Sequence, residues 1–136
     1  MQAQKWIRAA PAAALTVILG ICGGCQKKPP PVATSADVAL AKQEAQHEID
    51  QAQVEARKDV KSATKIMGPD SKDVARAKVT GAFDIAMARA DGDHKVALEQ
   101  CMTLPPTAQQ PCKDKVEIDY QAAVAKAKAY RVAQTQ

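Results

Sequence analysis

The sequence predicts an all-α fold: an elongated up-down-up three-helix bundle, or a long helical hairpin with a third helix. Alanine is abundant while aromatic residues make up only 3% of the chain. Apolar residues recur at helical spacing in three long runs, and glycine and proline separate the runs. Because alanine favours helix but buries little surface, we expect a thin core between closely spaced helices.

The first predicted helix covers residues 37–67, with Asp37 as its N-cap and a Gly-Pro pair at positions 68–69 as its end. Leu40 and Val54 point away from its main apolar stripe, toward a second partner face. The stripe repeats every eleven residues, about 3.67 residues per turn, which predicts a nearly straight helix. Its members are Val38, Ala41, Ala45, Ile49, Ala52, Ala56, Val60, Ala63 and Met67.

The second predicted helix covers residues 71–104, with Asp70 or Ser71 as its cap. Gly92 lies inside it, at a cost of about 1 kcal/mol for a mid-helix glycine, so a break or kink is an alternative there. The apolar phase continues across Gly92, which favours one continuous helix. The stripe consists of Ala75, Val79, Phe83, Ala86, Ala90, His94, Ala97, Cys101 and Leu104.

The third predicted helix covers residues 111–133 and follows a proline-rich turn at residues 105–111. Pro111 is expected in its first turn, where the missing N–H does no harm. The short connections predict that successive helices are antiparallel neighbours. The stripe of this helix consists of Cys112, Val116, Tyr120, Ala123, Ala127 and Tyr130.

Residues 1–24 are typical of an export signal peptide. Lys5 and Arg8 precede an almost wholly apolar run at residues 9–21. That run is shorter than the roughly 20 residues a membrane-spanning helix needs, and small residues follow it. The sequence therefore predicts three regions: a signal peptide (1–24), a tether (25–36) and an alanine-rich helical domain (37–136).

The junction Gly23-Gly24-Cys25 resembles the bacterial lipobox, in which a leucine, two small residues and a cysteine mark a lipidation site. The resemblance implies lipid on Cys25 and contact with a bilayer through N-terminal acyl chains. Cys22 departs from the pattern because it stands where leucine is usual. An ordinary secretory signal cut near Gly24 is the alternative to lipidation.

Cys22 is itself the alternative lipid acceptor, with Leu19 three residues before it. Ile21 immediately precedes it, and a β-branched residue fits poorly where the peptidase needs a small one. The resemblance therefore favours Cys25.

The predicted tether combines two lysines with three consecutive prolines at residues 29–31, which favour an extended polyproline II segment. Such a segment lifts a domain off a bilayer. Gln26 follows the proposed lipid site, and in the lipobox family a non-aspartate residue there implies the outer membrane, facing the periplasm. Inner-membrane anchoring and periplasmic secretion are the alternatives.

Charge is balanced in the predicted domain. Residues 37–136 contain 15 lysines and arginines and 15 aspartates and glutamates. This balance signals no basic face, so we expect no nucleic-acid partner. The sequence does not set an oligomeric state.

Cys101 ends the second stripe and Cys112 begins the third, so both are expected to face inward at one corner. In the oxidising compartment beyond an export signal, this pattern predicts a structural disulfide. The spacing is not C-x-x-C and no other ligands cluster nearby, which disfavours a redox or metal site.

No catalytic constellation, metal site or cofactor is predicted. His47 is expected at the surface and His94 at a helix interface. Asp91 and Asp93 lack the spacing of a calcium loop. We therefore expect a protein that is not an enzyme.

The helical part resembles small alanine- and lysine-rich proteobacterial envelope proteins with a cysteine-closed helical hairpin. The shared features are ALEQC at residues 97–101 and CKDK at residues 112–115, before an alanine-rich helix. This resemblance implies no activity. We expect a membrane-tethered envelope spacer or interaction module with a protein or peptidoglycan partner; the alternative is a periplasmic helical-hairpin chaperone or stress-response binding protein.

Overall fold

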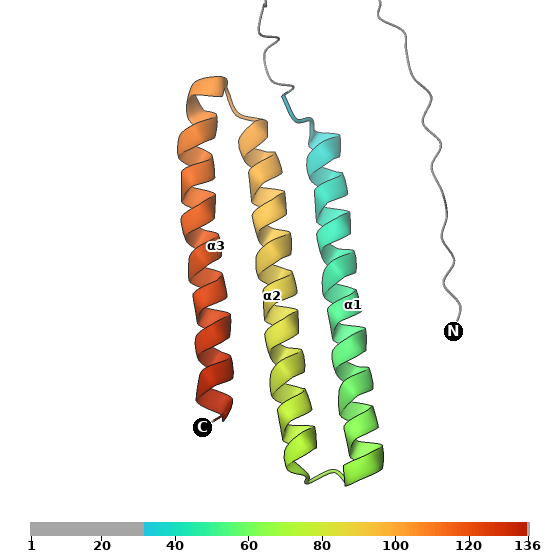
Figure 1. Cartoon of the computed structure of the whole chain (residues 1–136). Helices are drawn as coiled ribbons and strands as arrows, with labels where there is room; N and C mark the ends of the chain where they lie inside the picture. Colours follow the sequence, from blue (N-terminus) through green and yellow to red (C-terminus); the bar gives the residue numbers. More distant parts are fainter. Residues whose placement is uncertain (1–31, 136) are drawn as a thin grey trace, which may run out of the picture.

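Three antiparallel helices make up the described part of the computed structural model, residues 32–135. They are α1 (Ser35–Met67), α2 (Lys72–Met102) and α3 (Pro106–Thr135), and the predicted all-α class is confirmed. Figure 1 shows them side by side with α2 in the middle. Within residues 32–135, α2 packs against both neighbours while α1 and α3 do not touch. The fold is therefore a long hairpin with a third helix, arranged as a single layer.

The first helix begins two residues before its predicted start. Thr34 is the N-cap, and its side chain accepts a hydrogen bond from the Asp37 N–H. The Asp37 carboxylate accepts one in return from the Thr34 N–H at 2.7 Å, which completes a capping box. Asp37 thus supports the cap from inside the helix. Gly68 ends the helix with φ of 84°, a conformation that favours glycine.

The second helix is continuous through Gly92, so the prediction of one continuous helix is confirmed. Of the two candidate caps, Ser71 is used: its Oγ accepts from the Val74 N–H at 3.2 Å. Gly92 is buried against Ala45 of α1, and a Cβ added to it would lie 2.8 Å from the Ala45 Cβ. The glycine that weakens α2 as an isolated helix therefore lets the two helices approach closely.

The third helix begins at Pro106, five residues before the predicted start, so the predicted turn at residues 105–111 was too long. Pro106 takes the first helical position, which tolerates the missing N–H. Gln109 stabilises the early start, because its amide donates to the Leu104 carbonyl at 3.0 Å and to the Met102 carbonyl at 3.4 Å. Pro111 lies inside the helix.

The core is as thin as the alanine content predicts. Among residues 32–135, six apolar residues are buried, and four of them are alanines: Ala41, Ala45, Val74, Ala90, Cys101 and Ala127. Several members of the predicted stripes are exposed, namely Met67, Ala75, Leu104, Ala123 and Tyr130. Leu40 and Val54 are 55% and 45% exposed, as expected for residues facing away from α2.

Candidate functional site

The two predicted disulfide residues lie at one corner of the layer. Cys101 and Cys112 are joined, with their Cα atoms 5.6 Å apart. Cys101 is completely buried. Cys25 and Cys22, the two candidate lipid acceptors, lie outside the described residues.

The same corner receives the chain that leads into α1. The Ala33 N–H donates to the Met102 carbonyl at 3.3 Å, and Gln109 donates to that carbonyl from α3. The start of α1 and the α2–α3 turn therefore share one end of the layer, as Figure 1 shows. The α1–α2 turn and the end of α3 lie at the opposite end.

A groove with an apolar floor runs between α1 and α2. Gly81 of α2 and Ala56 of α1 lie in contact at this floor. The contact is close, because a Cβ added to Gly81 would lie 2.6 Å from the Ala56 Cβ. The two glycines of α2 are eleven residues apart, as are the two alanines that they meet. This common period keeps the straight helices in contact over about three turns. The rest of the floor consists of Val60, Ala77, Ala82 and Ile85.

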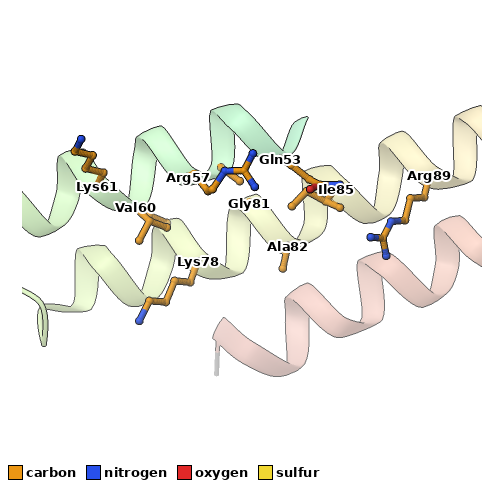
Figure 2. Close-up of a pocket in the computed structure, with 11 residues that line it drawn as sticks. Gln53, Arg57, Val60, Lys61, Lys78, Gly81, Ala82, Ile85 and Arg89 are labelled. Atoms are coloured by element: carbon orange, nitrogen blue, oxygen red, sulfur yellow. The ribbon is translucent and has the colours of Figure 1, made fainter. Parts of the chain in front are cut away.

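Four cationic side chains line this groove, which has a volume of about 550 Å³. Figure 2 shows Arg57 and Lys61 projecting from α1, and Lys78 and Arg89 from α2. No carboxylate lines the groove, and Gln53 is its one uncharged polar side chain. Within residues 32–135, none of the four cations takes part in an ion pair.

The groove continues across α2. Ala82 and Arg89 also line a second hollow of about 430 Å³ between α2 and α3. Lys126 adds a fifth cation there, and Asp93 is the one carboxylate lining it. The same face of the layer is therefore hollowed and mainly cationic on both sides of α2.

A polar cluster joins α2 and α3 separately from the groove. The Tyr120 hydroxyl donates to an Asp91 carboxylate oxygen at 2.7 Å, and this bond together with burial raises the pKa of Tyr120. The His94 ring stacks on Tyr120 with centroids 4.4 Å apart. The buried Nε2 of His94 has no hydrogen bond, although a Glu117 carboxylate oxygen lies 3.3 Å away. His94 thus lies at a helix interface, as predicted.

These contacts provide no recognisable reaction centre. Among residues 32–135, no three His, Cys, Asp or Glu side chains gather closely enough to hold a metal ion. None of the described helices has an apolar stretch long enough to cross a membrane. What the arrangement offers chemically is a cationic, apolar-floored surface.

Comparison with protein-family models, curated proteins and solved structures finds no match to this chain.

The cationic groove was missed at the level of sequence, where the charge balance signalled no basic face. That balance is an average over residues 37–136, whereas the structure brings four cations to one groove. A partial signal was present. Arg57 and Lys61 are four residues apart and share a helix face, and Lys78 and Arg89 are separated by the eleven-residue period.

Proposed function

We propose that this protein is a lipid-tethered, non-enzymatic component of the bacterial envelope, which acts as a spacer or interaction module at the periplasmic face of the outer membrane. The Gly23-Gly24-Cys25 junction and the proline-rich segment after it support the tether. The observation that carries the interaction role is the uncovered groove between α1 and α2, with four cations that lack ion-pair partners among the described residues.

The position of the groove suits a tethered binder. The chain enters α1 at the end of the layer that the Cys101–Cys112 disulfide reinforces. Arg57 and Lys61 lie 22 and 26 residues after Ser35, which corresponds to about 33 and 39 Å along α1. The groove would therefore project from the tethered end toward the periplasm.

The tether is tested by Cys25→Ser, with Cys22→Ser as the matched control. Acyl chains on Cys25 would give stable membrane anchoring. We expect the wild-type protein and the Cys22→Ser variant in the outer-membrane fraction, and Cys25→Ser in the soluble fraction or unprocessed. Intact mass of the extracted protein checks the lipid directly. A water-soluble mature chain with a free thiol at Cys25 would contradict the tether.

A periplasmic chaperone is the second candidate, and the concave apolar floor of the groove favours it. A chaperone would suppress the aggregation of several unrelated unfolded proteins near equimolar ratio. An interaction module would suppress none of them. Light scattering of two chemically different clients distinguishes the two functions.

A further inference from the structure

The α1–α2 groove has a shape into which another helix can pack. Two antiparallel helices form it, and small side chains line its floor around the Gly81–Ala56 contact. Helices pack by laying side-chain ridges into such grooves, and small floor residues allow a close approach. Because α3 packs against α2 and does not touch α1, no described helix covers this groove.

The charges around the groove specify the occupant further. Arg57 and Lys61 line it from α1, and Lys78 and Arg89 line it from α2 (Figure 2). A complementary ligand therefore needs anionic groups along both of its flanks and an apolar face between them. Lys78 and Arg89 are eleven residues apart, so the ligand must extend for about 16 Å, or three helical turns.

We infer that this groove binds an acidic amphipathic helix of a protein partner. The inference rests on the proposed function, because it names the partner class of that interaction module. An amphipathic helix places glutamates on both sides of an apolar stripe, and arginine pairs with carboxylates through a planar fork of donors. An anionic lipid fits less well, because a groove open along its length leaves an acyl chain partly in water.

A synthetic helical peptide of eighteen residues tests the inference. One version carries alanine and leucine on one face and glutamate on both flanks, and its control carries glutamine in place of every glutamate. We expect the full chain to bind the glutamate peptide by fluorescence anisotropy and to bind the glutamine peptide much more weakly. Binding should weaken as ionic strength rises from about 0.01 to 0.15 M, since screening shortens the reach of charge.

Charge reversal in the chain locates the binding site. Arg57→Glu with Lys61→Glu should weaken peptide binding roughly tenfold, because two attractive contacts become repulsive. Lys58→Glu with Lys65→Glu is the matched control: the same helix takes the same change in charge at exposed residues outside the groove. That control should change binding less than twofold.

A steric variant tests the groove without a change in charge. Ala77 is half-buried and lines this groove but not the α2–α3 hollow, so Ala77→Trp should fill the groove and weaken binding. Thermal melts of all variants show that each one folds.

Absence of peptide binding, or equal loss in both charge-reversed pairs, would overturn the inference. Phosphatidylglycerol vesicle binding that requires Arg57 and Lys61, without any peptide binding, would assign the groove to a lipid surface and also overturn it. The proposed tether is measured separately by membrane fractionation. A protein that is membrane-tethered but does not bind the peptide therefore refutes this inference and leaves the proposed tether standing.

Discussion

The α1–α2 interface and the α2–α3 interface are both formed by α2, but their contacts differ in kind. Against α1, the buried glycines Gly81 and Gly92 let two alanines approach, and the one ion pair between these helices among residues 32–135 joins Lys95 and Glu48. Against α3, the contacts are a disulfide, the Gln109 cap, the Tyr120–Asp91 hydrogen bond and Arg131 over the Phe83 ring. Backbone proximity holds the first pair of helices, and specific side-chain links hold the second.

The difference shows two ways in which an alanine-rich chain can join long helices. Close approach brings many backbone and Cβ atoms into contact without large side chains, but it leaves no room for an added methyl group. Individual side-chain links, such as a disulfide or a hydrogen bond, tolerate a wider spacing between helices. Each such link then contributes a larger share of the free energy of unfolding. The two interfaces should therefore respond to different substitutions.

Removal of the disulfide should have the largest effect. For Cys101→Ser with Cys112→Ser, a loop of this size predicts a loss of about 3 kcal/mol on the chain-entropy account. Since about 1 kcal/mol shifts the melting temperature of such a domain by roughly 4–8 °C, melting should fall by more than about 10 °C. Circular dichroism should retain most helix content at low temperature, because alanine propensity does not depend on the bond.

Hydrogen exchange tests whether this loss is confined to one interface. Amides of α3 should lose protection in the double serine variant, while α1 and the α1-facing part of α2 should keep it. Reduced wild-type protein is the control for the serine substitutions. Equal loss of protection in all three helices would show that the interfaces do not act separately.

Overpacking of the glycine contact should have the next largest effect. In Gly81→Ala the new Cβ would lie 2.6 Å from the Ala56 Cβ, which cannot rotate away. Overpacking costs about 1–3 kcal/mol, and the better helix propensity of alanine returns up to about 1 kcal/mol. We expect a net fall in the melting temperature.

The swap Gly81→Ala with Ala56→Gly restores the space and should recover much of the lost stability. The same exchange at Gly92 and Ala45 is an independent repeat, because a Cβ there would lie 2.8 Å from the Ala45 Cβ. Stabilisation by Gly81→Ala alone would show that close approach is not what holds α1 to α2.

The smallest effect should come from Tyr120→Phe, which removes the hydrogen bond to Asp91 and leaves the ring stacked on His94. Because the pKa of Tyr120 is raised above its usual 10.0 in the folded chain, its contribution is complete below pH 10.0. The contribution is lost as pH rises through the folded-state pKa. Melting temperatures of the two proteins should therefore differ by a few degrees near pH 7 and converge in strong alkali. A constant difference up to pH 11 would contradict this assignment.

Local signals were sufficient to predict the helices. The eleven-residue stripe of α1, the Gly68 terminus and the unbroken apolar phase across Gly92 each depend on neighbours within a few turns. The disulfide could also be predicted, because Cys101 and Cys112 end and begin adjoining stripes. These features do not require knowledge of how the three helices are arranged.

The tertiary structure decided the rest, because those features depend on contacts between distant residues. The third helix begins before Pro111 because the Gln109 amide donates hydrogen bonds to the Met102 and Leu104 carbonyls. The helix propensity of the residues around Pro111 does not reveal these bonds. The groove stays uncovered because α3 packs against α2 without touching α1. Charge summed over residues 37–136 is neutral, but only the α1–α2 register places Arg57 and Lys61 around the same groove as Lys78 and Arg89.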